Sequence, residues 1–108
     1  MAYKINAIDL AARLSDTSSA VPLLLDVREE WEWNLVHIER SLHIPMNLIP
    51  ARLHELPENQ PIVTICHHGV RSWHVALYLE GIGFKEVASL SGGVEAWASL
   101  VDSSMPHY

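Results

Sequence analysis

Cysteine is almost absent from this sequence, because Cys66 is its one thiol. A single cysteine excludes an internal disulfide framework. Cys66 is therefore either a small buried apolar residue or a reactive thiol, and only its surroundings can decide between these two roles.

Positive charge is also scarce, since 7 Lys and Arg residues stand against 13 Asp and Glu residues and give a formal net charge of -6. An acidic protein repels polyanions, which argues against nucleic acid and anionic membranes as general partners. No apolar run approaches the roughly 20 residues of a membrane span, and the first residues do not resemble a signal peptide. We therefore expect a soluble protein of the cytoplasm.

Repeats, low-complexity runs and linkers are absent as well, and Gly and Pro residues stand singly between short apolar segments. The chain has 108 residues, of which 49% are hydrophobic, and this is ample for one packed core. We expect one domain over residues 1–108, acting as a monomer.

The apolar segments alternate between strand-like and helix-like patterns. Strands are predicted at 3–5, 21–27, 42–44, 62–66 and 87–90, and helices at 7–14, 29–35, 51–56, 71–80 and 94–100. Strands that alternate with helices indicate an α/β fold, in which a parallel sheet has helices on both faces. Ligands of such sheets bind where the carboxyl ends of the strands pass into loops. Cys66 lies at such a point.

The segment after the strongest predicted strand is Cys66-His67-His68-Gly69-Val70-Arg71-Ser72. Backbone N–H groups of a tight loop, together with the start of the next helix, form an anion-binding nest that favours a thiolate. The same N–H groups would hold the terminal sulfur of a persulfide. Gly69 lets the loop turn, and Arg71 offers a fork of donors for loop carbonyls or for an incoming anion.

Two other enzyme or ligand classes use similar residues. Cysteine-dependent phosphatases and arsenate reductases separate the cysteine and arginine by one residue more than the four found here, and they commonly have a histidine where this chain has Ile65. A zinc site made of Cys66, His67, His68 and His74 is disfavoured because adjacent residues of a tight loop point apart. We therefore predict no metal site. We expect His67 and His68 to be exposed loop histidines near a reactive thiol.

The loop that begins at Cys66 resembles the active-site loop of rhodanese-like domains. Further matches, in chain order, are Asp26-Val27-Arg28-Glu29, Glu32-Trp33, His37-Ile38, Ile44-Pro45 and Gly92-Gly93-Val94-Glu95-Ala96-Trp97. The segment 101–108 resembles the tail of small bacterial members, so the resemblance extends over nearly the whole chain.

This resemblance implies a domain built on a parallel sheet of about five strands, and a sulfurtransferase activity that needs no cofactor. Cys66 would take a sulfane sulfur from thiosulfate, a polysulfide or a persulfide and pass it to a thiol or protein acceptor. The loop amides and Arg71 would support the persulfide. A non-catalytic binding or regulatory module with the same fold remains the alternative, although such modules usually lack the cysteine.

Two departures from the family pattern bear on function. Glycines are usual at the positions of Val36 and Arg40, which leaves the local turn open. Members that use thiosulfate often have a basic residue beside the cysteine, whereas this loop has His67 and His68, which are only partly charged near neutral pH. We expect thiosulfate to be used poorly, and more slowly as pH rises, and a persulfide or polysulfide to serve better.

The remaining polar and aromatic candidates are assigned mainly structural roles. Asp26 and Arg28 could be catalytic, but a carboxylate at a strand end more often anchors a neighbouring loop or an arginine through hydrogen bonds, so we assign both a supporting, scaffold role. Trp33 and Trp97 match core positions of the family, which leaves Trp31 and Trp73 as exposed or site-lining residues. We expect His37 and His43 to be structural histidines with satisfied hydrogen bonds. Gly92-Gly93 most simply permits a tight turn into the last helix, and the same turn could border the pocket.

Overall fold

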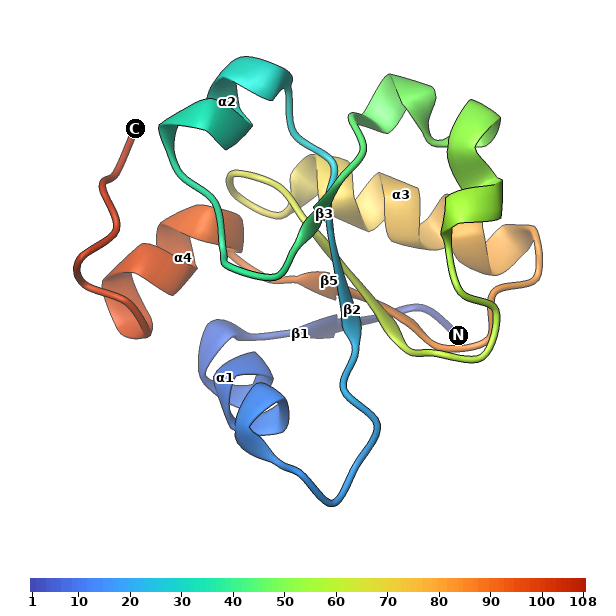
Figure 1. Cartoon of the computed structure of the whole chain (residues 1–108), viewed down its shortest axis with the longest axis horizontal. Coiled ribbons are helices and arrows are strands. Elements are labelled where there is room, and N and C mark those ends of the chain that lie inside the picture. Colours follow the sequence, from blue (N-terminus) through green and yellow to red (C-terminus); the bar gives the residue numbers. More distant parts are fainter.

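A single parallel sheet organises the computed structural model, which describes all residues, 1–108. The five strands are β1 (Tyr3–Ile5), β2 (Leu23–Asp26), β3 (Leu42–His43), β4 (Ile62–Ile65) and β5 (Val87–Leu90), arranged in the order β1-β5-β4-β2-β3 (Figure 1). Every neighbouring pair is parallel. The predicted α/β fold with a parallel sheet of about five strands is confirmed.

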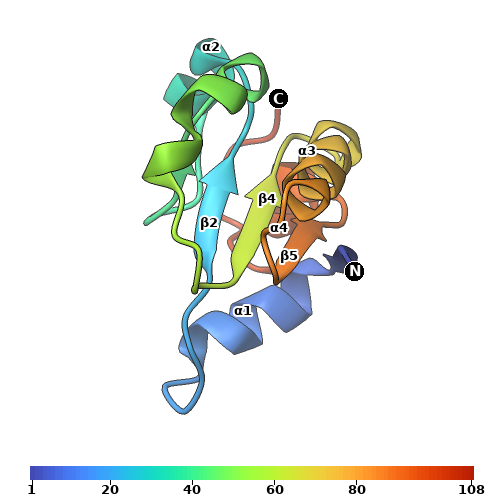
Figure 2. The same cartoon turned by 90° about the vertical axis from the view of Figure 1, so that its right-hand side faces the viewer.

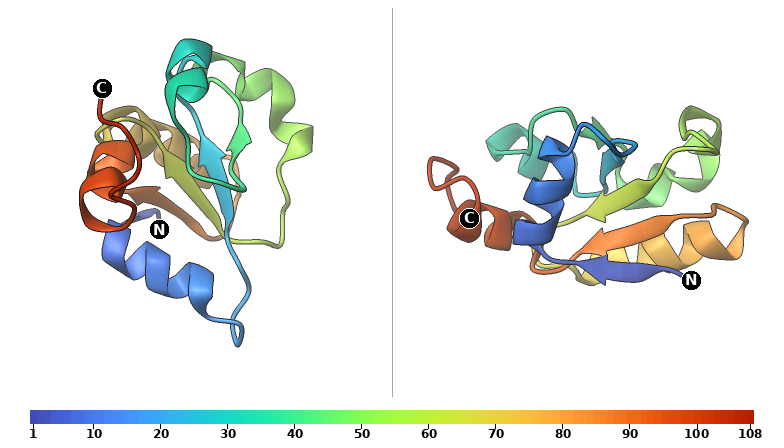
Figure 3. Two further views of the ribbon diagram at one scale, coloured as in Figure 1. Left: turned by 60° about the vertical axis from the view of Figure 1, so that its left-hand side comes forward. Right: turned by 90° about the horizontal axis from the view of Figure 1, so that it is seen from below.

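Helices cover both faces of this sheet, as predicted. They are α1 (Ala7–Ser15), α2 (Glu30–Leu35), α3 (Val70–Gly81) and α4 (Gly93–Leu100), with the short 3-10 helices η1 (Met46–Leu48) and η2 (Pro50–Glu55). Figures 2 and 3 show α1 and α4 on one side of the strands and α3 on the other. The short helix predicted at 51–56 corresponds to η2, which is a 3-10 helix that begins one residue earlier and has non-helical backbone at Arg52.

Two apolar clusters fill the space between the sheet and its helices. The first joins α1 and α4 to β4 through residues that include Leu10, Val63, Ile65, Val94 and Trp97. The second joins α3 to the opposite face and includes Leu25, Ile62, Cys66, Val75 and Leu79. Side chains alternate between the faces along β4. The Cys66 side chain therefore belongs to the face that α3 covers.

The carboxyl ends of the central strands meet at one edge of the molecule. In Figure 2 the arrowheads of β2 and β4 point to the edge where α2 and the beginning of α3 lie. The loop between β4 and α3 occupies this edge, at the place where ligands of parallel sheets bind.

The turn over residues 36–41, where glycines are usual in the family, forms here without glycine. Arg40 has a φ of 69°, which places it in the left-handed region that favours glycine, whereas Val36 is extended, with a φ of -166°. Extended backbone suits valine, so only the arginine departs from its usual conformation.

None of the helices combines the length and the apolar character that crossing a membrane requires.

Candidate active site around Cys66

The Cys66 side chain is enclosed by the loop that follows it. Only 1% of the residue is exposed. Its Sγ lies 3.1 Å from the Gly69 backbone nitrogen and 3.4 Å from the Ser72 backbone nitrogen, and both N–H groups donate to the sulfur. The Ser72 hydroxyl is also 3.4 Å from Sγ. Two amides and one hydroxyl therefore converge on one sulfur atom.

The N-terminus of α4 fixes the shape of this loop. The backbone N–H of Val94 donates to the Cys66 carbonyl at 2.9 Å, and that of Glu95 donates to the His67 carbonyl at 3.1 Å. Gly93 has a φ of 57°, and a Cβ at this position would overlap both carbonyl oxygens. The predicted role of the Gly92-Gly93 turn as a border of the site agrees with these contacts.

Arg71 forms an ion pair with Glu32, the third residue of α2. Its two terminal nitrogens donate to the two carboxylate oxygens at 2.7 and 2.9 Å. Burial alone would raise the pKa of Glu32, but hydrogen bonds from Arg71 and Tyr108 outweigh it and hold this pKa at about 2. Of the two expected roles of Arg71, binding of loop carbonyls is not observed, because both terminal nitrogens donate to Glu32, and binding of an incoming anion stays a prediction.

Tyr108 connects this ion pair to a second one. Its hydroxyl donates to Glu32 at 2.7 Å and accepts from Arg28 at 2.8 Å. Burial and the hydrogen bond to Glu32 raise the pKa of Tyr108 to about 12. The phenol ring also stacks on the His67 ring, with 3.8 Å between the ring centroids. The segment after α4 thus returns to the loop, beside α2 (Figure 1).

Asp26 and Arg28 form the second ion pair, which is completely buried. The guanidinium donates to both Asp26 oxygens, with Nη2 at 2.7 Å from Oδ2, and Nη2 also donates to the Val36 carbonyl at 2.6 Å. Arg28 is joined through the Tyr108 hydroxyl to the Glu32–Arg71 ion pair. The scaffold role of both residues stays a prediction.

The two loop histidines differ in their surroundings. His68 is exposed, whereas His67 is half-buried between the rings of His68 and Tyr108. Burial lowers the pKa of His67 below the ordinary value of 6.5, and the neighbouring His68 lowers it further. The expectation that both are exposed loop residues is wrong for His67, which Tyr108 covers.

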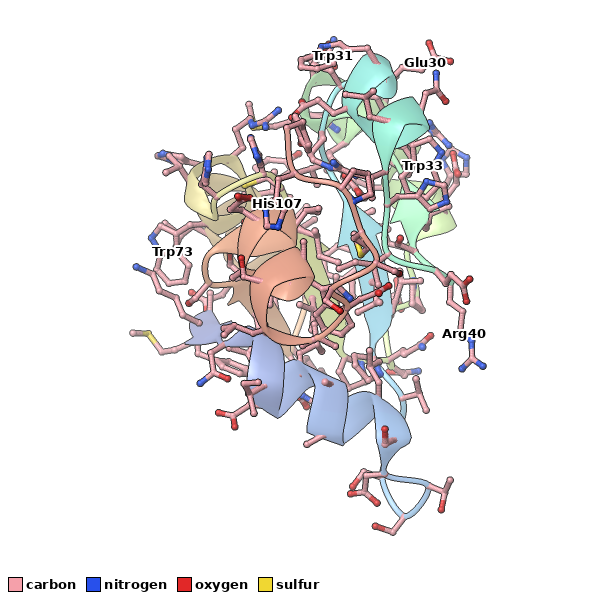
Figure 4. The ribbon with its side chains drawn as sticks, turned by 90° about the vertical axis from the view of Figure 1, so that its left-hand side faces the viewer. Glu30, Trp31, Trp33, Arg40, Trp73 and His107 are labelled. Carbon is pink, nitrogen blue, oxygen red and sulfur yellow. The ribbon has the colours of Figure 1, made fainter.

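The burial of the tryptophans agrees only in part with the prediction. Trp97 belongs to the core, but Trp33 is half-buried and stacks on the rings of His37 and His43. Trp31 is exposed on α2, and Trp73 projects from another side of the molecule. Figure 4 labels both side chains. Trp73 is half-buried against the second core cluster and does not line the site.

The two structural histidines and the rejected metal ligand lie away from Cys66. His37 and His43 each place a ring nitrogen on a backbone carbonyl, at 3.0 and 2.8 Å respectively, as expected for satisfied histidines. His74 borders a shallow apolar groove between α3 and η2. No group of three or more His, Cys, Asp or Glu side chains gathers around a common point suited to a metal ion.

Three residues of the site had no assigned role in the sequence: Glu32, Ser89 and Tyr108. Glu32 carried a local signal, because its carboxylate accepts from the Glu29 N–H at 3.0 Å in the manner of a capping box. Ser89 and Tyr108 reach the site from distant parts of the chain. No short sequence pattern links them to it.

Comparison with known proteins gives matches along most of the chain. The family model described as the rhodanese-like domain matches residues 6–100. A sulfurtransferase of Allochromatium vinosum is 38% identical over 98 residues, 91% of this chain and 90% of that protein. The thiosulfate sulfurtransferase GlpE of Pseudomonas syringae is 37% identical over 75 residues, 69% of this chain and 71% of GlpE. The crystal structure of a rhodanese-like domain protein from Staphylococcus aureus superposes with a TM-score of 0.83 at 30% identity, covering 100% of this chain and 99% of that one.

Proposed function

The chain belongs to the rhodanese-like domain family, and we propose that it is a sulfurtransferase that carries a sulfane sulfur as a persulfide on Cys66. The observation that carries this proposal is the convergence of the Gly69 and Ser72 amides on the Cys66 sulfur. Fixed N–H dipoles aimed at one atom stabilise negative charge there. The relatives named sulfurtransferases support the transfer of sulfur.

The reaction proceeds in two transfers. The Cys66 thiolate attacks the sulfane sulfur of the donor, a Cys–S–S⁻ bond forms, and the donor leaves with the electron pair of its broken sulfur bond, as sulfite from thiosulfate or as a thiolate from a persulfide. A thiol or protein acceptor then attacks the terminal sulfur. The S–S bond to Cys66 breaks and the thiolate returns.

Charge around the loop bears on the choice of donor. Arg71 is already paired with Glu32, and the lowered pKa of His67 leaves that ring neutral near pH 7. Little free positive charge then faces thiosulfate, which is a dianion. We propose that a persulfide or polysulfide is the better donor. Because the pKa of His67 lies below 6.5, any slowing of thiosulfate turnover caused by its deprotonation belongs below that pH.

Cellular context extends the same proposal. A persulfide carrier needs a reduced thiol, and Cys66 has no second cysteine with which to form a disulfide. We place the reaction in the cytoplasm, carried out by a monomer whose partners are the sulfur donor and acceptor. Nucleic acid and membranes are not among these partners, given the net charge of -6.

Mass spectrometry of the intact protein tests the sulfur-carrying role. Wild type and Cys66→Ser are incubated separately with thiosulfate and with polysulfide. We expect wild type to gain one sulfur atom, faster from polysulfide, and to lose it when a thiol acceptor is added. The serine variant should gain none.

Two results would count against the proposal. A wild-type protein that gains no sulfur from any donor would favour the non-catalytic module. Equal labelling of the Cys66→Ser variant would place the sulfur elsewhere. Thiosulfate turnover that equals polysulfide turnover would reject the donor preference alone.

A further inference from the structure

Ser89 is a buried hydroxyl that no step of the proposed reaction uses. It lies in β5 with 1% of the residue exposed. Its Oγ is 2.7 Å from the Ser72 Oγ, and either oxygen can be the donor. Ser89 Oγ makes no other hydrogen bond. Since the Ser72 Oγ is 3.4 Å from the Cys66 sulfur, the three atoms form one row that leads from β5 to the thiol.

Counting protons along this row separates the two charge states of Cys66. Two contacts join the three atoms of this row, Sγ, Ser72 Oγ and Ser89 Oγ, and each contact can hold one hydrogen bond. When Cys66 is a thiol the three groups carry three protons, so one proton, at either end of the row, has no acceptor within it. When Cys66 is a thiolate the groups carry two protons, and each proton makes one of the two hydrogen bonds. A buried donor without an acceptor is costly, so the row favours the thiolate.

The direction of the hydrogen bonds follows from this count. In the thiolate state Ser89 donates to Ser72, and Ser72 donates to the sulfur. The neighbouring Thr64 hydroxyl does not replace Ser89 as the donor to the Ser72 hydroxyl. It is buried and donates to the Ser72 backbone carbonyl at 2.7 Å. The Gly69 and Ser72 amides already donate to Sγ.

We infer that Ser89 is a positioning residue, which turns the Ser72 proton toward Cys66 and so stabilises negative charge on the sulfur. The inference rests on the proposed function, in which Cys66 is the nucleophile. Ser89 acts through Ser72 and touches neither donor nor acceptor. Its contribution comes in addition to that of the two amides, because successive hydrogen bonds in a chain polarise one another, so the bond from Ser89 strengthens the one from Ser72 to the sulfur.

Charged groups around the loop act on the same thiol and must stay constant in a test. Arg71 is the cation that responds to the charge of Cys66, and Glu32 pairs with it. The other charged or titratable groups near the loop are His67, His68, Glu95, Arg28 and Tyr108. None of these side chains hydrogen-bonds to Ser89. A change at Ser89 therefore leaves their arrangement in place.

The test is the rate at which iodoacetamide alkylates Cys66, measured across the neutral and alkaline range. We expect Ser89→Ala to react about fivefold more slowly than wild type near neutral pH, the effect of one hydrogen bond. The rate should reach the wild-type plateau at higher pH. Ser89→Thr, which keeps the hydroxyl, should restore the wild-type profile. Ser91→Ala, just beyond β5, serves as the matched control and should react as wild type.

A double variant tests whether Ser89 acts on the Cys66 sulfur through Ser72. Ser72→Ala/Ser89→Ala should react at the rate of Ser72→Ala, because Ser89 has no path to the sulfur without Ser72. Additive effects of the two changes would overturn the inference, as would a wild-type profile for Ser89→Ala or an equal slowing at every pH. Alkylation needs no sulfur donor, so a failed sulfur-transfer assay with a shifted alkylation profile would reject the proposed function and keep the role of Ser89.

Discussion

Tyr108 is the residue whose contacts extend furthest across the site. Its hydroxyl lies between the Asp26–Arg28 and Glu32–Arg71 ion pairs, and its ring covers His67. Arg28 is fully buried, so its guanidinium depends on protein acceptors for every N–H group. Tyr108 is one of these acceptors.

Replacing this tyrosine tests the bridge between the ion pairs. Tyr108→Phe keeps the ring stacked on His67 but leaves a buried Arg28 N–H without its acceptor and removes a donor from Glu32. We expect the free energy of unfolding in urea to fall by about 1–3 kcal/mol. Tyr78→Phe is the control, because Tyr78 is 39% exposed and its hydroxyl makes no hydrogen bond. Equal stability of the two variants would show that the bridge contributes nothing.

The lowered pKa of Glu32 predicts that the folded protein loses stability in acid. Its pKa is held at about 2, below the ordinary 4.5, so its ionised form stabilises the fold fully above pH 4.5 and progressively less as pH falls toward 2. Glu32→Gln removes this dependence. The stability difference between wild type and the variant should be about 2 kcal/mol smaller at about pH 3 than at about pH 6.

An exposed carboxylate provides the comparison for this measurement. Glu55 is paired with Arg52 on the surface of η2, where solvent screens the ion pair. Glu55→Gln should change stability little at either pH. A difference for Glu32→Gln that stays constant with pH would contradict the lowered pKa of Glu32.

Single residues also show which contacts of the site could be predicted from the sequence. Gly69, Arg71 and Ser72 lie within six positions of Cys66, and a strand followed by a tight loop was enough to place them around the thiol. Tyr108 lies 76 positions from Glu32 along the chain, and only the packing of the whole fold brings the two together. Local spacing carries no information about such a contact.

At the scale of elements, α4 holds the loop from the side opposite to the loop's own helix, α3. The first amides of α4 bind the carbonyls of Cys66 and His67, and Gly93 permits that approach.

The element boundaries followed apolar runs, so β4 and β5 were predicted within one residue of their observed ends. The short helix at 51–56 was predicted too, but apolar spacing does not distinguish an α-helix from the 3-10 helix observed there.

A methyl group at Gly93 tests the contact between α4 and the loop. The added Cβ overlaps two carbonyl oxygens, and φ is positive, so Gly93→Ala must displace the backbone of the loop. We expect a loss of about 2 kcal/mol or more in stability and a slower gain of sulfur by Cys66. Gly81→Ala is the control, because no atom lies within 4 Å of the new methyl group at the end of α3. Comparable losses in both variants would contradict the proposed contact.

At the scale of the whole molecule, two apolar clusters share one sheet and neither is complete without it. Leu10 contributes to one cluster and Leu79 to the other, and both are fully buried. We propose that residues 1–108 unfold as one unit. Composition and alternation predicted this architecture, because burial on both faces leaves a strong signal in the sequence.

Truncation on either face should therefore weaken the whole domain. We expect Leu10→Ala and Leu79→Ala each to lower stability by about 2–5 kcal/mol and to keep a single transition. Tryptophan fluorescence and far-ultraviolet circular dichroism should report the same midpoint for each variant. Two separate transitions, or a change confined to one probe, would mean that the faces unfold independently.

The hydrogen bonds from α4 to the loop carbonyls have a consequence for the speed of each transfer. In water, solvent dipoles must reorient every time charge moves from one sulfur to another. Here the loop that carries the Gly69 and Ser72 amides is held in place when the chain folds, because α4 binds the Cys66 and His67 carbonyls at its start. In the proposed transfers the moving charge would meet dipoles that are already aligned, so little reorganisation energy would be needed.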